Sequence, residues 1–357
     1  MNVSKGVSNN KIITITNYDN MGRVDLTKGP YLTGNFSDSN PFSHTPPSLY
    51  PTAEKTFDYM GRVVIVKTPK YQGSQSQFDT TNISYNGFAT TVTDPKSNTR
   101  TEITDYLGRI IEVQEDSDGG TTFYDYNAAG DLVAVEDDEG NMTSISYNTL
   151  GQKLSMNDPD MGIWSYTYDL NGNLYQQTDA KGQIIRFTYD ALNRITLKNY
   201  YNTSDPDVYY YYDNISIANG IGRLNYVTNG NATTTYNSYD VMGRVTSVTK
   251  NITGDTNRTT LFTYDLSGKP VRTTYPDGFW TQNNYYSKTN LLNTVTASDN
   301  VTYATVGSYS PSGKIKTLSH GNGSSTTYTY DDRTESLYEI LTKNGSNTII
   351  QQKRYGY

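Results

Sequence analysis

A repeat of 21 residues constrains the fold of this chain more than any other feature of its sequence. Four tyrosines stand 21 positions apart, and each is followed by Asp or Asn: Tyr126, Tyr147, Tyr168 and Tyr189. Four positions after each of them comes a residue suited to a turn: Gly130, Gly151, Gly172 and Asn193. A fixed period of this size indicates a repeat architecture. The period is most regular over residues 104–194.

Each repeat holds two copies of one turn signal. The first is Tyr-Asp/Asn-x-x-Gly, as at Tyr168, Asp169 and Gly172, and the second is Asp-x-x-Gly, as at Asp137 and Gly140. Both are typical of a type I turn, because the carboxylate accepts hydrogen bonds from amides two residues further on and Gly tolerates φ > 0. We interpret these positions as a structural repeat motif, which recurs at Asp190, Tyr239, Asp240, Gly243, Tyr264, Asp265 and Gly268.

The residues between the turns alternate with a period of two. Trp164, Tyr166 and Tyr168 share one parity, whereas Ser165 and Thr167 share the other. This alternation indicates β-strands, and β-branched and aromatic residues suit a pleated, half-buried surface. The turn spacing leaves about 5–7 residues per strand. We therefore predict an all-β protein, in which each repeat is a β-hairpin and successive hairpins form a long antiparallel meander.

The repeat extends over the whole chain, so we predict a single array over residues 1–357. Five of the 12 prolines fall within residues 28–56. Because proline cannot donate to a sheet ladder, we expect this segment to be an insertion or long loop rather than strand. The spacing is looser over residues 195–357. The sequence ends on Tyr355 and Tyr357, a Tyr-x-Tyr pattern that elsewhere precedes Asp, so we expect a fragment of a longer protein.

Composition narrows the classes of function. The net charge is −7 and the basic residues are scattered singly, which argues against nucleic acid as a partner. No apolar run approaches the roughly 18 residues of a membrane span, and residues 1–5 lack the apolar core of a signal peptide. The sequence contains no Cys, which excludes disulfides and thiol chemistry and fits an exported bacterial protein.

No pattern in the sequence points to a catalytic centre. The two histidines, His44 and His320, are too few for a His-rich metal site, and a Gly-x-Ser-x-Gly motif is lacking. The Asp residues could supply a carboxylate pair for glycoside hydrolysis, but their period matches the turns and we interpret them as turn caps. We therefore predict a chain that is not an enzyme, with no catalytic, cofactor-binding or metal site.

Two kinds of binding stay open as alternatives. One is a weak Ca²⁺ site at the acidic clusters of residues 115–118 and 136–139, although Ca²⁺ needs roughly six to eight oxygen ligands and turn chemistry is the interpretation that we prefer. These clusters belong to a column of Asp116, Asp137, Asp158 and Asp179. The other is recognition of glycans by exposed Tyr rows. The shared parity of Tyr166 and Tyr168 favours a packed face over such a row.

Two further expectations concern contacts between strands. Arg109, Arg194 and Arg244 each follow a turn. We expect them to pair with neighbouring Asp residues or with Tyr rings across strands. The first and last strands of the array should present unpaired edges, so we expect limited self-association.

The Tyr-Asp-x-x-Gly-Arg units resemble the YD repeats of the Rhs family, as at Tyr18 to Arg23 and Tyr239 to Arg244. This family includes bacterial Rhs polymorphic toxins, wall-associated proteins, components of insecticidal toxin complexes and the teneurins. The resemblance implies a spiralling β-sheet that closes into a hollow shell, inside which bacterial members hold a toxic C-terminal domain. For this chain we expect a long, curved or spiralling antiparallel sheet that forms a partial shell. Residues 331–357 lack the family's self-cleaving signature.

The resemblance implies a non-enzymatic structural scaffold, part of an Rhs-like shell that encapsulates or presents a toxin or effector domain. The expected partners are the rest of a longer Rhs-like chain or the enclosed toxin domain, and the expected location is secreted or at the cell surface. The alternative is a carbohydrate- or cell-surface-binding module that uses exposed Tyr rows.

Overall fold

The computed structural model describes residues 2–5, 11–33, 48–71, 74, 76–116 and 119–356. These residues form thirty β-strands in a single sheet, and none of the described residues is helical. The prediction of an all-β fold is confirmed. Within this described part, no helix is long and apolar enough to cross a membrane.

The strands are short and evenly distributed along the chain. The first fifteen are β1 (Asn2–Lys5), β2 (Lys11–Tyr18), β3 (Val24–Thr33), β4 (Thr52–Phe57), β5 (Val63–Pro69), β6 (Phe78–Asn86), β7 (Ala89–Thr93), β8 (Thr99–Thr104), β9 (Ile110–Gln114), β10 (Thr121–Tyr126), β11 (Leu132–Glu136), β12 (Met142–Tyr147), β13 (Lys153–Asp158), β14 (Gly162–Tyr168) and β15 (Leu174–Thr178). The other fifteen are β16 (Ile184–Tyr189), β17 (Ile195–Tyr200), β18 (Val208–Tyr212), β19 (Leu224–Thr228), β20 (Ala232–Tyr239), β21 (Val245–Ile252), β22 (Arg258–Tyr264), β23 (Pro270–Thr274), β24 (Trp280–Tyr285), β25 (Leu292–Ala297), β26 (Thr302–Tyr309), β27 (Ile315–His320), β28 (Ser325–Tyr330), β29 (Leu337–Lys343) and β30 (Ile349–Arg354).

Each strand pairs antiparallel with the strands before and after it in the chain, so the sheet is one continuous meander. At the end of β14 the register shifts between Thr167 and Tyr168. Gly172, in the turn that follows, has a φ of +86°. A register shift beside a left-handed turn residue is a β-bulge, which increases the local twist of the pair.

The two faces of the sheet differ in polarity, as the alternation predicted. In β14, Trp164, Tyr166 and Tyr168 are half-buried, whereas Ser165 and Thr167 are exposed. The hydroxyl-bearing residues pair across neighbouring strands; for example, the Oγ atoms of Ser146 and Ser155 lie 2.6 Å apart and those of Thr188 and Thr196 lie 2.9 Å apart. Cross-strand pairs of this kind fix the register of antiparallel strands.

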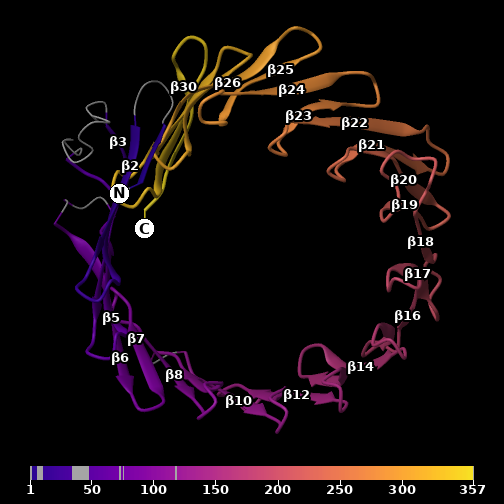
Figure 1. Cartoon of the computed structure of the whole chain (residues 1–357), viewed down its shortest axis with the longest axis horizontal. Coiled ribbons are helices and arrows are strands. Elements are labelled where there is room, and N and C mark those ends of the chain that lie inside the picture. Colours follow the sequence, from indigo (N-terminus) through magenta and orange to yellow (C-terminus); the bar gives the residue numbers. More distant parts are fainter. Residues whose placement is uncertain are drawn as a thin grey trace.

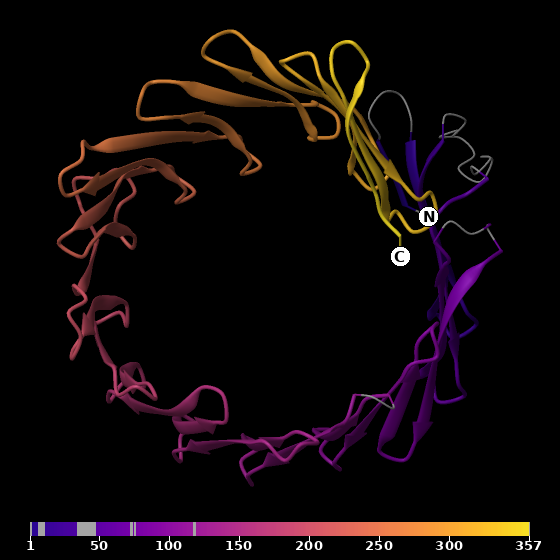
Figure 2. The same cartoon turned by 180° about the vertical axis from the view of Figure 1, so that it is seen from behind.

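The sheet curls into a ring, and its two ends meet (Figure 1). The indigo N-terminal strands and the yellow C-terminal strands lie side by side in both views, and no described segment crosses the middle of the ring (Figure 2). No strand pairing joins β30 to β1 or β2 among the described residues. The ring is therefore an open sheet whose ends are in contact, which agrees with the predicted curved sheet.

We call the contact between the two ends the seam, and define it by Tyr71 and Phe78 on one side and Arg333 and Tyr355 on the other. The hydroxyl of Tyr71 donates to the carbonyl of Tyr355 at 3.0 Å, between residues 284 positions apart in the chain. The guanidinium carbon of Arg333 lies 5.1 Å from the centre of the Phe78 ring. These side-chain contacts join the two ends of the sheet, and no strand pair within the described ranges does so.

The small core of the molecule gathers near the seam. The largest fully buried side chains are those of Arg333, Tyr31, Ile13 and Val306, which come from the two ends of the chain. A pocket of about 360 Å³ is lined by residues of both ends, among them Thr68 and Arg333. The rest of the sheet is a single layer whose side chains are at most half-buried, with isolated exceptions such as Val113 and Tyr239.

The prediction that residues 28–56 are not strand is wrong at both ends of the segment. Pro30 lies within β3, and Thr52 to Thr56 lie within β4. The register of β3 with β2 shifts beside Pro30, from Tyr31 opposite Ile13 to Lys28 opposite Ile15. Proline is tolerated there because a bulge does not need its missing amide donor. The middle of the segment, residues 34–47, lies outside the described residues.

Candidate functional site

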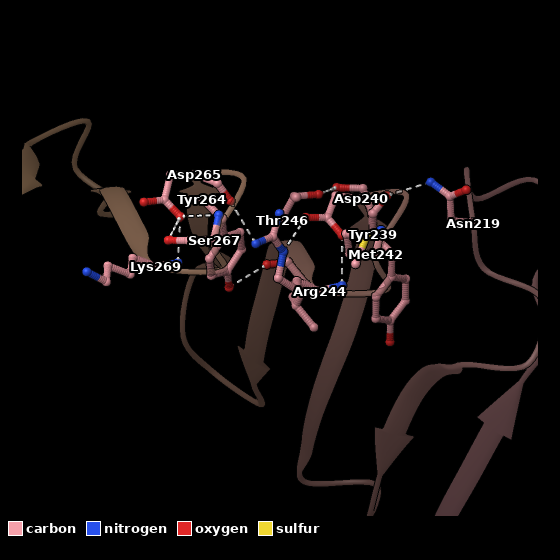
Figure 3. Close-up of polar contacts among 12 residues, drawn as sticks. Asn219, Tyr239, Asp240, Met242, Arg244, Thr246, Tyr264, Asp265, Ser267 and Lys269 are labelled. Carbon is pink, nitrogen blue, oxygen red and sulfur yellow. Dashed lines mark hydrogen bonds and ion pairs between the residues drawn. The ribbon is translucent and has the colours of Figure 1, made fainter. Parts of the chain in front are cut away.

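Every Tyr-Asp/Asn-x-x-Gly turn lies on the same edge of the sheet, because each follows an even-numbered strand. The turn at Asp240 shows how the motif is built (Figure 3). The Oδ1 atom of Asp240 accepts from the amides of Met242 at 2.9 Å and Arg244 at 3.0 Å. The amide of Gly243 donates to the Asp240 carbonyl at 2.9 Å, and Gly243 has a φ of +83°. The carboxylate thus caps its own turn, and a residue that tolerates the left-handed region completes the turn.

The arginine after the turn connects one repeat to the next. The Nε atom of Arg244 donates to Oδ2 of Asp240 at 2.6 Å, and its Nη1 donates to the carbonyl of Asp265 in the following turn at 3.0 Å. Its guanidinium carbon lies 4.6 Å from the centre of the Tyr264 ring. The Tyr264 hydroxyl in turn donates to the carbonyl of Val245 at 3.0 Å (Figure 3). We call this set the inter-repeat contact: the turn Asp, the following Arg, and the Tyr of the next repeat.

The inter-repeat contact recurs along the edge. An Arg of one turn stacks on a Tyr of the next repeat in the pairs Arg62–Tyr85, Arg109–Tyr126, Arg194–Tyr212, Arg223–Tyr239 and Arg244–Tyr264. Ion pairs join Arg109, Arg194 and Arg244 to their own turn Asp. The expectation that these arginines pair with neighbouring Asp residues or Tyr rings is confirmed, and the structure shows that one guanidinium does both.

The repeat tyrosines share one position in the fold. Tyr126, Tyr147, Tyr168, Tyr189, Tyr239 and Tyr264 are each the last residue of a strand. The hydroxyls of Tyr168 and Tyr189 donate to the carbonyls of Lys153 and Leu174, at 2.9 and 2.8 Å. Each hydroxyl therefore reaches the first residue of the strand immediately before it, just after the preceding Tyr-Asp/Asn-x-x-Gly turn.

The turn residues named from the sequence also occupy equivalent positions. Positive φ angles occur at Gly130, Gly151, Gly172, Gly243 and Gly268. Asp169, Asp190, Asp240 and Asp265 each accept two backbone amides within their own turns. Equivalent residues thus form the same local structure along the edge.

Protonation equilibria reflect these contacts. The side-chain hydrogen bond from Asn173, together with backbone amide bonds, lowers the pKa of Asp169 below the ordinary 3.8. Burial raises the pKa of Tyr168 and Tyr189 above the ordinary 10.0. The turn carboxylates are therefore held charged and the tyrosine hydroxyls are held protonated, so both keep the form that the hydrogen bonds require.

The acidic column on the opposite edge also caps turns. Oδ1 of Asp137 accepts from the amides of Glu139 and Asn141, and Oδ1 of Asp158 accepts from those of Asp160 and Met161. In the described part of the chain, no three His, Asp or Glu residues are grouped so that they could hold a metal ion. Residues 117 and 118 of the first acidic cluster lie outside that part.

Of the two histidines, only His320 belongs to the described part of the chain. His44 lies outside the described residues. His320 ends β27, and its Nε2 lies 3.0 Å from the Thr326 hydroxyl. A nucleophile is activated by a base that a third group, usually a carboxylate, holds in position. The contact between His320 and Thr326 is only a hydroxyl–imidazole pair between neighbouring strands.

The seam is the structural feature that the sequence did not reveal. The turn after Tyr330 reads Asp331-Asp332-Arg333-Thr334-Glu335 and lacks the usual Gly. It places Arg333, which is 1% exposed, against the opposite end of the sheet. The missing Gly is a sequence signal at this repeat, but the turns that end at Asn193 and Asn290 lack Gly as well, so it does not single out the seam.

Similarity to known proteins identifies the repeat and the fold. The RHS Repeat family model matches residues 168–199. The fold matches the crystal structure of TcdB2-TccC3 with a TM-score of 0.79 and 19% identity, over 98% of this chain and 20% of that chain. TcdB2-TccC3 without its hypervariable C-terminal region gives a TM-score of 0.80 and 19% identity, over 98% of this chain and 19% of that chain.

A third solved structure, a Photorhabdus luminescens Tc holotoxin pore, matches with a TM-score of 0.79 and 19% identity, over 98% of this chain and 19% of that chain. The chain thus spans about a fifth of the length of the solved chains that it matches. No curated protein matches its sequence. Residues 168–199 of this chain are thus an Rhs repeat, and the chain as a whole shares its fold with TcdB2-TccC3.

Proposed function

We propose that this chain is a structural scaffold, a ring-shaped part of the wall of an Rhs-like shell that encloses or presents a toxin or effector domain. The observation that carries the proposal is the continuous sheet that curls into a ring with its two ends in contact (Figure 1). A wall has to keep its curvature without a second layer of structure behind it. A closed ring meets that requirement.

The inter-repeat contact supports a wall-forming role. It joins neighbouring hairpins through an ion pair, a cation–π contact and a tyrosine hydrogen bond, as at Asp240, Arg244 and Tyr264. The stability of repeat proteins comes from the repeats themselves and from the contacts between neighbouring repeats. These side chains are engaged in holding repeats together, which is the behaviour of a scaffold rather than of a catalyst.

The partners and the location follow from the same reasoning. The matched structures include a Tc holotoxin, and they are about five times as long as this chain. That likeness supports an exported, bacterial protein whose partners are further Rhs-type wall and an enclosed toxin domain. In both views the C-terminus lies toward the middle of the ring (Figure 2), so a domain joined there would start on the inner side.

Glycan binding is the weaker alternative. The rings of Tyr126 and Tyr264 are covered by Arg109 and Arg244, and their hydroxyls donate to backbone carbonyls. A sugar would need those faces free for stacking. Exposed aromatic residues such as Tyr59 and Tyr106 lie at separate turn tips and do not form a row on one strand.

The test is limited proteolysis of the full-length polypeptide that the natural gene encodes. We expect any further domain in it to resist protease while joined to this array and to be cleaved when expressed alone. A matched variant, Arg333→Ala, should raise cleavage of that domain by weakening the seam. If the gene encodes no further domain, or if that domain is cleaved at the same rate with and without the array, the proposal is wrong.

A further inference from the structure

The two edges of the sheet use the same turn but carry different residues at its tip. We call the edge with the turns that follow even-numbered strands the YD edge. In the short turns of this edge, six tip residues are large, apolar and at least 80% exposed: Tyr59, Tyr106, Leu150, Leu170, Val241 and Leu266. Ile215, in the longer turn after β18, is 87% exposed. On the opposite edge, the tips carry polar or small residues such as Asp138, Glu139 and Lys181, or a less exposed apolar residue such as Met161.

Turn chemistry does not explain this difference. The turns at Asp137 and Asp169 make the same hydrogen bonds, from Gly140 and Gly172 to the Asp carbonyl at 3.1 Å in both cases. Solvent-exposed central positions of such turns normally carry polar residues. Large exposed apolar groups gathered on one edge instead mark an interaction surface.

We propose that the YD edge binds the YD edge of a second copy of this chain. Consecutive tips on one edge are two strands apart, which gives a spacing of roughly 10 Å. A partner that presents apolar groups at the same spacing is the same edge of another copy. Pairing like edges makes the interface self-complementary, which is the usual form of a two-fold dimer.

The available area is sufficient for such an interface. Burying one side chain of this size removes roughly 60–120 Å² of apolar surface, so the six tips supply roughly 400–700 Å² on each copy. Met21, Leu107, Leu192 and Met242 lie on the same edge and are 62–74% exposed. Their contribution brings the total to the roughly 800 Å² per partner that stable interfaces bury.

Charge favours this partner over a membrane or over the opposite edge. The arginines that flank the tips are neutralised by their own turn Asp, as in Arg109 with Asp105 and Arg244 with Asp240. The YD edge therefore offers little attraction to anionic lipid. Stacking it on the opposite edge would bury Asp138 and Glu139, whereas pairing two YD edges leaves those carboxylates in water.

Sedimentation velocity of the purified chain over a range of concentrations tests the proposal. We expect a reversible dimer. The triple variant L150Q/L170Q/L266Q should weaken it by about 100-fold or more. Because these side chains are at least 80% exposed, the variant should keep its circular dichroism and melting temperature. Two matched controls, Met161→Gln on the opposite edge and Ile350→Gln on β30, should dimerise like the wild type.

Three results would overturn the proposal. A chain that stays monomeric at all concentrations has no such interface, and binding of that monomer to phosphatidylcholine vesicles would assign the tips to a membrane. If the triple variant dimerises like the wild type, the apolar tips do not form the dimer interface. A loss of dimer in Ile350→Gln equal to that in the triple variant assigns the association to the edge strand β30. None of these readouts involves an enclosed domain, so the proposed function is tested separately.

Discussion

Individual residues fix the turns, and Gly108 allows the cleanest test of this claim. It has a φ of +80°, and nothing lies within 4 Å of the position that a Cβ would occupy. Gly108→Val should therefore destabilise the chain by roughly 1–3 kcal/mol through backbone strain alone. Gly108→Asn should cost much less, because Asn193 occupies the equivalent turn position with a φ of +60°. Urea denaturation measures the free energy of unfolding of both variants. An equal loss of stability in the two would contradict the turn assignment.

The tyrosine hydroxyls make stability depend on alkaline pH. Burial raises the pKa of Tyr168, Tyr189 and Tyr330 above the ordinary 10.0. A pKa that is raised in the folded state contributes stability that is present below pH 10.0 and is lost as the pH rises through the folded pKa. We expect the free energy of unfolding to fall above that pH, together with the appearance of tyrosinate absorbance. Constant stability through tyrosine ionisation would show that the hydroxyls are not buried donors.

The turn carboxylates make stability depend on acidic pH, in the opposite direction to the tyrosines. The side-chain hydrogen bond from Arg23 and its backbone amide lower the pKa of Asp19, and a hydrogen bond from Asn173 does the same for Asp169. A lowered folded pKa contributes stability that is present above the unfolded value near 3.8 and is lost as the pH falls through the folded pKa. Denaturation midpoints should therefore fall below that pH and stay level above it, up to the range where tyrosines ionise.

At the scale of the hairpin, the inter-repeat contact predicts a specific coupling. Arg244 stacks on Tyr264 of the next repeat at 4.6 Å, so a double-mutant cycle of Arg244→Met with Tyr264→Leu should give a coupling free energy of about 0.5–1 kcal/mol. The matched cycle of Arg244→Met with Tyr189→Leu joins residues in separate repeats and should be additive. Equal coupling in the two cycles would mean that the contact does not join neighbouring repeats.

The strands and turns could be predicted from the sequence because they depend on local patterns. Asp169 and Gly172 lie three positions apart, and the alternation in β14 is visible within seven residues. The segment around Pro30 was predicted wrongly because a bulge opposite β2 accommodates the proline, and that pairing is not visible in the local sequence. The apolar tips, such as Leu170 and Leu266, are readable in the sequence but gain meaning only when the fold places them on one edge.

At the scale of the whole molecule, ring closure could not be predicted from the sequence. Tyr71 and Tyr355 are 284 positions apart and carry no shared motif. Their contact depends on the accumulated curvature of the strands between them, β6 to β30, to which every bulge and turn contributes. The repeat thus predicts a curved sheet, while the seam follows only from how many strands the chain contains and how strongly each pair twists.

The central claim is that the two ends of the sheet meet, and a single distance tests it. The sequence contains no Cys, so nitroxide labels can be attached to cysteines that replace the exposed Lys70 and Lys353, which neighbour Tyr71 and Tyr355 in the seam. Pulsed electron paramagnetic resonance should show one short, narrow distance distribution, and Arg333→Ala should broaden it toward longer distances. A long or broad distribution in the unaltered seam would contradict the ring and leave an open strip.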